Sequence, residues 1–361
     1  MTSATLATME WDDALIPRGV VPAPLRSEVR GMVGAVPAWV AHVAAAPWFV
    51  RAMIRMMSRP VAFVPPRLCD LIMLVVSQDN SCRYCFGMQR AIMRVLGYRE
   101  TELARLEREH DLADTSQAER AAVEFARKIS RANPRVAAAE RDALAAAGYS
   151  PVGIAEIAFV AAATVFANRS ATLLALPPEP LERLVESPLG RLLRPVLARK
   201  LRPRPRAPER LSTPNDGPCA AVVAALDGSP AGNALRQTID EAWNSPVLPR
   251  RTKALLLAVI GRALGCARSE DEGAETLAQE GFRTAEISAM LATLASPRLD
   301  ARERRLVPFA RDTVRYDRIA PIQRRMRQAA EGLAPAETVE AVGVMALANA
   351  VCRLSVLLDA C

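Results

Sequence analysis

Aromatic residues are scarce in this sequence, and so are stretches in which apolar and polar residues alternate. Phe, Trp and Tyr make up 4% of 361 residues, whereas Ala, Leu, Val and Arg are abundant. Sheets favour β-branched and aromatic residues, so this composition argues against a β-rich protein. We therefore predict an all-α fold, and the length of the chain predicts two domains.

Segments that direct a protein to a membrane are also missing from the pattern. No positively charged stretch followed by an apolar core opens the chain, so we expect no secretory signal. The longest apolar run, Ile157 to Ala167, is too short to span a bilayer core of about 30 Å, and Glu156 and Arg169 lie just outside it. We expect a cytoplasmic protein without a membrane partner.

The net charge of +8 is concentrated in one segment. Between Arg191 and Arg210, seven Arg and one Lys stand against one acidic residue, Glu209. Because this segment is also rich in Pro, we interpret it as a solvated linker, with contact to an acidic partner as the alternative. No nucleic-acid partner is predicted, since a folded nucleic-acid binder usually carries its basic patch on a defined face.

The seven cysteines form no regular framework. An odd number of cysteines in a cytoplasmic chain argues against structural disulfides, and most are expected to be small buried hydrophobic residues. Only Cys82 and Cys85 have a spacing with chemical meaning. The cysteines are at positions 69, 82, 85, 219, 266, 352 and 361.

Pro, Gly and apolar residues together predict a series of helices. One helix at about 67–79 leads into the Cys pair, and the next ends at Gly97, a residue suited to a C-cap. An apolar helix follows from Pro151 to about Leu176. We divide the chain into an irregular N-terminal arm at 1–25, a helical domain at 26–186, a basic Pro-rich linker at 187–218 and a second helical domain at 219–361.

The second domain repeats the first. Adding 184 to a residue number relates the halves without a gap from Arg67 to about Leu174, which we interpret as a tandem duplication. Positions kept in both halves are expected to serve the fold, and positions kept in one half to serve chemistry. Matched pairs include Arg67/Arg251, Cys82/Cys266, Gly97/Gly281, Gly148/Gly332, Glu156/Glu340 and Arg169/Arg353.

The repeat separates two sets of polar residues. Glu156 and Arg169 recur in the second half, so we interpret them as buried structural charges with partners. Asp70, Cys85 and Gln89 do not recur, and the second half then keeps one thiol without a partner at that spacing. We therefore predict that the second half is chemically silent. The corresponding residues there are Ala254, Ser269, Gly273 and the thiol Cys266.

The Cys-x-x-Cys pair at a helix start suits redox chemistry. Cys82 would lie near unpaired backbone N–H groups and the positive end of the helix dipole, which stabilise a thiolate, and Arg83 adds positive charge. We therefore expect Cys82 to be the exposed nucleophile and Cys85 the more buried partner. Attack on a peroxide forms a sulfenic acid, which the second thiol converts to a disulfide, and a dithiol reductant restores the pair.

The pair has three other interpretations. A zinc site would need two more ligands; Cys69 is near, but the two histidines, His42 and His110, are distant in sequence. Two core cysteines could share this spacing by coincidence. A thioredoxin fold would place the pair after a strand, and no strand is predicted. A helical dithiol site remains the leading interpretation.

The residues around the pair resemble those of a known family. Ser77-x-x-Asn80-x-Cys82-x-Tyr84-Cys85 is similar to the core motif of the alkylhydroperoxidase D-like branch of the carboxymuconolactone decarboxylase family. The similarity covers about 40–176 and, more weakly, 225–359 through the repeat. It implies two tandem alkylhydroperoxidase D-like helical domains, usually in an oligomer. It also implies peroxidase activity through the dithiol, with re-reduction by lipoyl or related thiol partners.

Two positions depart from the family's pattern. The family's proton relay uses a Glu twelve residues before the first Cys and a His four residues after the second, and here these positions are Asp70 and Gln89. Asp keeps the carboxylate with a shorter reach, whereas Gln cannot exchange a proton near neutral pH. The relay would need water or Asp70 in place of Gln89, and loss of a general base commonly slows turnover by about 10²–10⁴-fold.

We therefore expect a cytoplasmic thiol oxidoreductase of the peroxiredoxin type that reduces hydroperoxides or disulfides. Cys82 and Cys85 are the predicted redox pair, with Asp70 as a proton acceptor. Gln89 is expected to orient a water or a thiol. The alternatives are a non-catalytic scaffold or binding protein with a decayed site and, third, lactone decarboxylation.

Supporting residues and partners complete the prediction. Ser77 and Tyr84 are expected to support the site, with helix packing as the alternative for each. No bound cofactor or metal is implied, because the reductant is an external thiol on a lipoyl group or a thioredoxin-like protein. A homo-oligomer is consistent with the sequence.

Overall fold

The chain is helical throughout the part that the computed structural model describes, which confirms the predicted all-α class. The described residues are 6, 9–109, 115–130, 138–201, 206–212, 217–315 and 318–361, and no strand lies among them. The first half contains α2 (Ala23–Val33), α3 (Val40–Val43), α4 (Pro47–Met57), α5 (Pro66–Asp79), α6 (Arg83–Leu96), α7 (Glu100–Glu109), α8 (Gln117–Arg127), the 3-10 turn η1 (Lys128–Ser130), α9 (Ala138–Ala146), α10 (Pro151–Leu173), α11 (Pro180–Glu186) and α12 (Pro188–Leu201). The second half contains α13 (Ala220–Ala224), α14 (Pro230–Asn244), α15 (Arg250–Leu264), α16 (Ala267–Gln279), α17 (Thr284–Thr293), α18 (Glu303–Asp312), α19 (Ile319–Ala329) and α20 (Pro335–Leu358).

Proline and glycine mark the ends of the helices around the Cys pair. α5 and α10 each carry a proline in the first turn, where the missing N–H removes no helix hydrogen bond. Gly97 ends α6 with φ +113°, a left-handed conformation that glycine adopts without a Cβ clash. Its N–H donates to the carbonyls of Met93 and Arg94. These boundaries agree with those predicted for the two helices that flank the pair.

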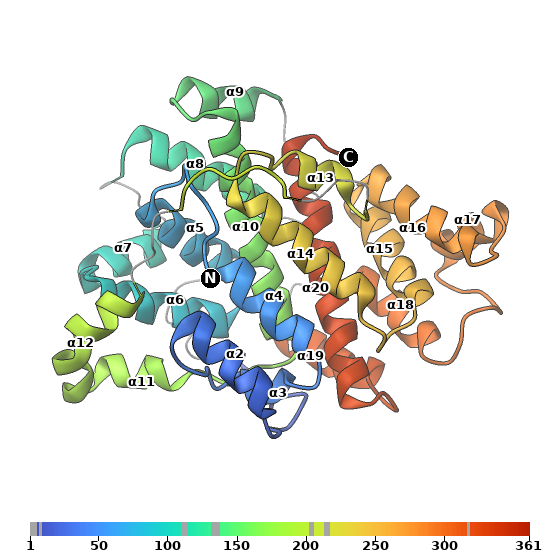
Figure 1. Ribbon diagram of the computed structural model, residues 1–361, viewed down its shortest axis with the longest axis horizontal. Coiled ribbons are helices and arrows are strands. Elements are labelled where there is room, and N and C mark those ends of the chain that lie inside the picture. Colours follow the sequence, from blue (N-terminus) through green and yellow to red (C-terminus); the bar gives the residue numbers. More distant parts are fainter. Residues whose placement is uncertain are drawn as a thin grey trace.

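The order of helices repeats along the chain with the offset found in the sequence. The starts of α5, α6, α7 and α10 precede those of α15, α16, α17 and α20 by 184 residues each. Figure 1 shows α5 to α8 on one side of a central pair of helices and α15 to α18 on the other. One continuous hydrophobic core runs through both sets.

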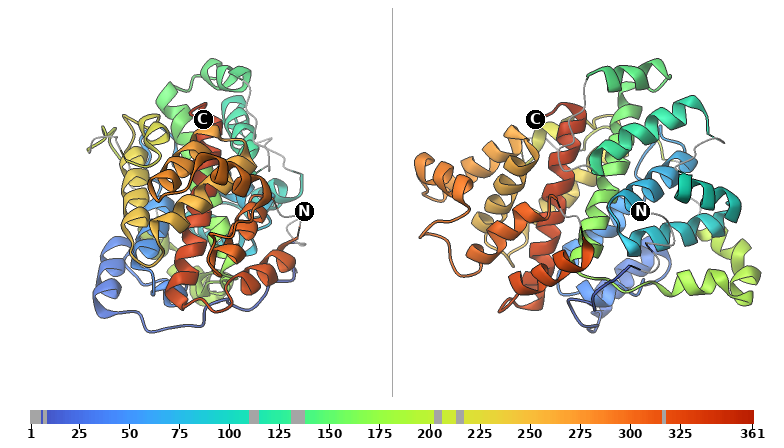
Figure 2. Two further views of the ribbon diagram at one scale, coloured as in Figure 1. Left: turned by 90° about the vertical axis from the view of Figure 1, so that its right-hand side faces the viewer. Right: turned by 180° about the vertical axis from the view of Figure 1, so that it is seen from behind.

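The central pair consists of the two longest helices, α10 and α20, which pack side by side (Figures 1 and 2). Almost every residue of each helix is buried, so each is apolar around its whole circumference. By length and composition both are long and apolar enough to cross a membrane, but 89% of each apolar window is buried inside the protein. Core packing accounts for their hydropathy, which makes them weak evidence for a membrane span.

The two halves contact each other through helices and hydrogen bonds on either side of α10 and α20. α4 packs against α14, and the indole N–H of Trp48 on α4 donates to Glu340 Oε2 on α20 at 3.0 Å. In the opposite direction, Ser229 Oγ, just before α14, donates to Glu156 Oε1 on α10 at 2.7 Å. Each half therefore supplies a donor to the buried carboxylate of the other half.

Each buried carboxylate also holds the chain ahead of a helix in its own half. Glu156 accepts hydrogen bonds from the N–H groups of 62–64, at 2.7, 2.7 and 3.0 Å. Glu340 accepts one from the N–H of Leu248 at 3.0 Å, and Lys253 Nζ lies 3.0 Å from Glu340 Oε1. These segments lead directly into α5 and α15, so the two carboxylates position equivalent helices.

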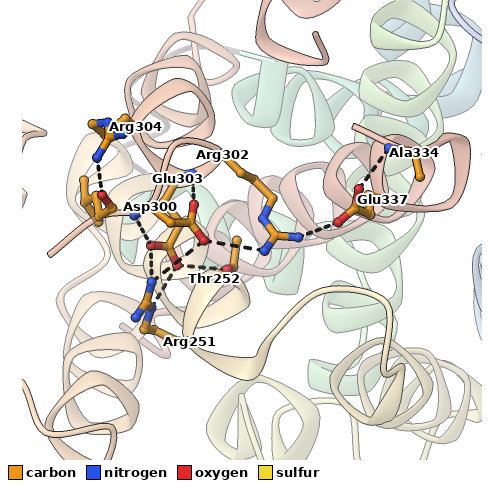
Figure 3. Close-up of polar contacts among 9 residues, drawn as sticks. Arg251, Thr252, Asp300, Arg302, Glu303, Arg304, Ala334 and Glu337 are labelled. Carbon is orange, nitrogen blue, oxygen red and sulfur yellow. Dashed lines mark hydrogen bonds and ion pairs between the residues drawn. The ribbon is translucent and has the colours of Figure 1, made fainter. Parts of the chain in front are cut away.

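A polar cluster fastens the starts of three helices in the second half (Figure 3). Glu303 is fully buried at the start of α18, and it accepts hydrogen bonds from Arg251 Nε at 2.9 Å and Thr252 Oγ1 at 3.0 Å on α15. Arg302 donates to Glu337, in the first turn of α20, at 2.5 Å. Because these charges satisfy one another, we interpret the cluster as structural.

Part of the segment predicted as a solvated linker is helical. Residues 188–201 form α12, and α11 and α12 both pack against α6, the helix that carries the Cys pair. We refer to residues 180–201 as the α11–α12 cover. The structure differs here from a solvated linker because this segment packs on the folded first half.

The predicted N-terminal arm also makes defined contacts. Trp11 Nε1 donates to the carbonyl of Leu176 at 3.1 Å, and the N–H of Asp12 donates to Gln323 Oε1 at 2.9 Å. The arm therefore lies against both halves, and α2 begins at Ala23, within the predicted arm.

Replacing Trp48 by phenylalanine should lower the free energy of unfolding by about 1–3 kcal/mol, the cost of leaving a buried polar group with one donor fewer. The measurement is equilibrium unfolding in urea. Trp243→Phe is the matched control, since Trp243 is a partly buried tryptophan on α14. Equal losses in the two variants would contradict a stabilising bond between the halves.

Candidate active site

The Cys pair lies at the start of α6, as the sequence predicted. Cys82 is the N-cap residue, and its Sγ accepts a hydrogen bond from the N–H of Cys85 at 3.4 Å. Unpaired backbone N–H groups and the helix dipole favour negative charge at this end of a helix. Cys82 is fully buried, whereas Cys85 retains 9% exposure. The expected order of exposure is therefore wrong, because Cys82 packs toward α10 in the core.

The two thiols differ in acidity. Burial opposes ionisation of Cys82, but hydrogen bonds from the thiol and N–H of Cys85 hold its pKa below the ordinary value. The Thr172 hydroxyl and the Arg169 guanidinium lower that pKa further. Burial raises the pKa of Cys85 well above the ordinary value, and its hydrogen bond to Cys82 acts in the same direction. The pair thus favours one thiolate, on Cys82, with Cys85 as the donor.

α10 supplies polar side chains that the sequence analysis did not place in the site. Asn168 donates through Nδ2 to Ser77 Oγ at 3.1 Å, and its amide opposes the rise in the pKa of Cys85. Thr172 lies one turn further along the same helix. Ser77 therefore orients an amide that contacts the pair, which is a supporting position. The available signal for Asn168 and Thr172 was their polarity within an otherwise apolar helix.

Arg169 connects the site with the second half. It donates to Asn80 Oδ1 at 3.0 Å and to the carbonyl of Val314 at 3.4 Å. Its counterpart Arg353 donates to the same carbonyl at 2.8 Å. The two arginines therefore meet at one acceptor between the halves, which agrees with a structural role. Arg169 has a second effect, because its charge favours the Cys82 thiolate.

Asp70 and Gln89 lie together between α5 and α6. Gln89 Nε2 donates to Asp70 Oδ1 at 2.9 Å, and the Tyr98 hydroxyl donates to Asp70 Oδ2 at 3.1 Å. Arg59 forms an ion pair with the same buried carboxylate. Gln89 Oε1 is buried without a hydrogen-bond partner among the described residues. Asp70 is thus held by three donors, while the partners of the thiols come from α10.

Tyr84 fastens the α11–α12 cover to α6. Its hydroxyl donates to Glu179 Oε1 at 3.2 Å, and the same oxygen accepts the N–H of Trp39 at 2.9 Å. α11 begins at the next residue after Glu179. A Cβ on Gly87 of α6 would lie 2.5 Å from the carboxylate of Glu182, so α11 approaches α6 closely. Tyr84 therefore supports the cover beside the pair.

The second half fills the space that the polar pair occupies in the first. The counterparts of Asp70 and Gln89 are Ala254 and Gly273. A Cβ on Gly273 would lie 2.7 Å from the Ala254 carbonyl oxygen and 2.7 Å from the Cβ of Ala258. α15 and α16 therefore pack with their backbones close together. The helix pair α15 and α16 thus packs without polar residues at the positions that correspond to Asp70 and Gln89.

Cys266 has no partner at the spacing of the Cys82–Cys85 pair, but it has one from another part of the chain. Cys266 and Cys361 lie at disulfide-bonding distance, with their Cα atoms 5.1 Å apart and 95 residues between them in sequence. The prediction that the chain lacks disulfides is wrong at this pair, because the end of α20 returns to the start of α16. The other cysteines are free and buried: Cys69, Cys82, Cys85, Cys219 and Cys352.

Among the described residues no group of three or more His, Cys, Asp or Glu side chains is arranged to hold a metal ion. His42 Nδ1 lies 2.7 Å from the carbonyl oxygen of Ile16, within the fold. His110 lies outside the described residues.

No protein-family model, curated protein or solved structure matches the chain. The resemblance to the alkylhydroperoxidase D-like branch stays a prediction. Function is therefore inferred from the geometry of the site.

Replacing Thr172 by valine should raise the pKa of Cys82, because it removes a hydroxyl near the sulfur and keeps the shape of the side chain. A thiolate forms as pH rises through the pKa, so ionisation in wild type should occur at lower pH than for a free cysteine, whose pKa is about 8.5. The variant should shift this transition upward. The measurement is the ultraviolet absorbance of the thiolate against pH, taken as the difference from the matching Cys82→Ser protein.

Thr164→Val is the control for this shift. Thr164 is a buried threonine on the same helix, and its hydroxyl donates to the carbonyl of Val160 at 2.7 Å. Identical pH transitions in the Thr172 and Thr164 variants would show that the Thr172 hydroxyl does not stabilise the thiolate.

Proposed function

We propose that this protein is a dithiol oxidoreductase in which Cys82 and Cys85 cycle between two thiols and a disulfide while reducing hydroperoxides or disulfides. The observation that carries the proposal is the hydrogen-bonded thiol pair at the start of α6, with the pKa lowered on one sulfur and raised on the other. A pair that shares one thiolate is suited to exchange.

The proposal includes a tandem duplication of an alkylhydroperoxidase D-like helical domain. The equal offset of four helix starts supports it, as do the equivalent carboxylates Glu156 and Glu340 and the arginines Arg169 and Arg353 that meet at one carbonyl. Only the first copy keeps Cys85, Asp70 and Gln89, so the proposed peroxide chemistry belongs to that copy.

The unequal exposure of the two sulfurs assigns them separate roles. Cys85 is the residue of the pair that retains some exposure, so we assign the attack on the substrate to Cys85 and the role of the base to Cys82. Cys85 passes its proton along the existing hydrogen bond to Cys82, and its sulfur attacks a peroxide oxygen. The O–O bond breaks, the alkoxide takes the proton from Cys82, and Cys85 becomes a sulfenic acid.

The second step closes the disulfide. Cys82, again a thiolate, attacks the sulfur of Cys85 and expels hydroxide, which takes a proton from solvent to form water. Two electrons have then passed from the thiols to the hydroperoxide, leaving an alcohol, water and the Cys82–Cys85 disulfide. These roles reverse those expected from the sequence, where Cys82 was the exposed nucleophile.

An external dithiol restores the pair. Its thiolate attacks Cys85, and Cys82 leaves as the thiolate that Thr172 and Arg169 stabilise. The second thiol of the reductant then releases Cys85. Because the α11–α12 cover lies on α6 and leaves little of Cys85 exposed, a slender lipoyl arm suits this access better than a broad protein surface.

Asp70 and Gln89 are assigned to substrate orientation. The carboxylate of Asp70 is held by Arg59, Tyr98 and Gln89, which leaves Gln89 Oε1 as a buried acceptor with no partner among the described residues. A hydroperoxide hydroxyl or a water is a group that such an acceptor can bind.

A non-catalytic binding or scaffold role is the second candidate. The full burial of Cys82 and the three donors on Asp70 favour it, since both features limit access to reacting groups. The acid–base asymmetry of the thiols opposes it, because a packing role alone requires no thiolate.

The test is turnover of an organic hydroperoxide with dihydrolipoamide as reductant. Cys82→Ser and Cys85→Ser should each lower the rate by more than about 10²-fold, since each removes a group that takes part in the chemistry. Cys69→Ala is the control, because burial raises the pKa of Cys69 to about 12 and this thiol has no part in the mechanism. Equal background rates in all four proteins would leave only the binding role.

Replacing Gln89 by histidine should raise turnover by up to about 10²–10⁴-fold, the usual contribution of a general acid or base. An imidazole can keep the hydrogen bond to Asp70 and exchange a proton through its other nitrogen. The measurement is kcat/KM against pH, with a new dependence expected near the ordinary histidine pKa of about 6.5.

Asp70→Asn added to that variant should remove the gain, because the imidazole then loses its carboxylate partner. If Gln89→His matches wild type at every pH, position 89 takes no part in proton transfer.

A further inference from the structure

A second sulfur pair lies at the corresponding place in the second half. Cys266 is the N-cap residue of α16, as Cys82 is of α6, and it lies at disulfide-bonding distance from Cys361. Cys361 follows the end of α20 and is exposed, whereas Cys266 is fully buried. The end of α20 thus supplies the partner that α16 lacks at the Cys85 position, where Ser269 stands.

We infer that Cys266 and Cys361 form a second exchangeable disulfide, which external dithiols reduce by attack on Cys361. Cys361 is the exposed residue of the pair, and access together with the quality of the leaving thiol decides which sulfur is attacked. Cys266 is suited to leave as a thiolate. It lies at the N-terminus of a 13-residue helix, and the hydroxyl of Ser269 is 3.3 Å from its sulfur.

The exchange balances as a transfer of two electrons from the dithiol. The reductant thiolate bonds to the sulfur of Cys361, the Cys266–Cys361 bond breaks, and Cys266 leaves as a thiolate. The second thiol of the reductant then attacks its own sulfur in the mixed disulfide and releases Cys361. The reductant departs as a disulfide, and the reverse sequence with an oxidised dithiol restores the bond.

The neighbouring thiols are kept out of this exchange. Burial raises the pKa of Cys352 to about 12. Burial and the nearby Glu272 raise the pKa of Cys219 well above its ordinary value. Since the thiolate is the reacting form and both residues are buried, attack by these neighbours on the Cys266–Cys361 bond is disfavoured.

The experiment uses the full chain with Cys82→Ser and Cys85→Ser, so that the first pair is absent. The protein is oxidised with lipoamide in its disulfide form, then treated with dithiothreitol in native buffer and freed of reagent. Thiols are counted in denaturant before and after reduction, and peptide mass spectrometry locates them. We expect a gain of two thiols per chain, at Cys266 and Cys361.

Two further variants separate this exchange from other thiols. Adding Cys361→Ser to this double variant should abolish the gain of two thiols. Because Cys361 is exposed, thermal unfolding of the triple variant should show an intact fold. Added Cys352→Ala should leave the gain at two.

A chain that cannot be oxidised at this pair, or that gains no thiol under dithiothreitol, overturns the inference. Because this background lacks the first pair, that result leaves the proposed peroxide chemistry untouched. Loss of hydroperoxide turnover in the first half would equally leave this thiol count unchanged.

Discussion

Two buried charges on α10 hold both ends of α5 and thereby place the Cys pair. Glu156 binds the backbone N–H groups ahead of α5, and Arg169 binds Asn80 at its end. Thirteen residues of helix separate the two charges, about 20 Å at 1.5 Å per residue, which matches the length of the 14-residue α5. Leaving a buried charge without its partner is strongly destabilising. Both ends of α5 are therefore held at the spacing of Glu156 and Arg169 along α10. Cys82, two residues beyond Asn80, is therefore held against α10.

The two halves share the buried carboxylate and arginine but differ at the residues around the Cys pair. The second half keeps the equivalent carboxylate and arginine. Glu340 binds the segment ahead of α15, whereas Arg353 donates to the carbonyls of Ile129 and Val314. The second half fills the space of Asp70 and Gln89 with a close approach of two helices at Gly273. The second half thus packs these helices without the polar pair and without a cysteine at the position that corresponds to Cys85.

The parts of the fold set by local signals could be predicted from the sequence. Proline in the first turn of α5 and α10 and the glycine after α6 mark helix ends through their own backbone preferences. The period of 184 residues likewise predicts the positions of equivalent helices, because a repeated sequence repeats its local signals. The location of the Cys pair at a helix start follows from the same information.

The parts of the site that depend on tertiary contacts could not be predicted. Asn168 and Thr172 are polar residues in an apolar helix, and nothing local shows that they turn toward the thiols. The same holds for the order of exposure of Cys82 and Cys85, which depends on α10 and on the α11–α12 cover. Cys361 is 95 residues from Cys266, a separation at which sequence spacing carries no information on proximity.

The most direct measurement is a single turnover of the reduced protein with one equivalent of an organic hydroperoxide, followed by peptide mass spectrometry. The mass of the wild-type peptide should fall by two hydrogen atoms, because a Cys82–Cys85 disulfide forms. Cys82→Ser should instead carry a sulfenic acid on Cys85, trapped by dimedone, because the attacking sulfur remains and the resolving one is gone. A wild-type protein whose two thiols stay unmodified while the hydroperoxide persists would contradict the dithiol chemistry proposed for this fold.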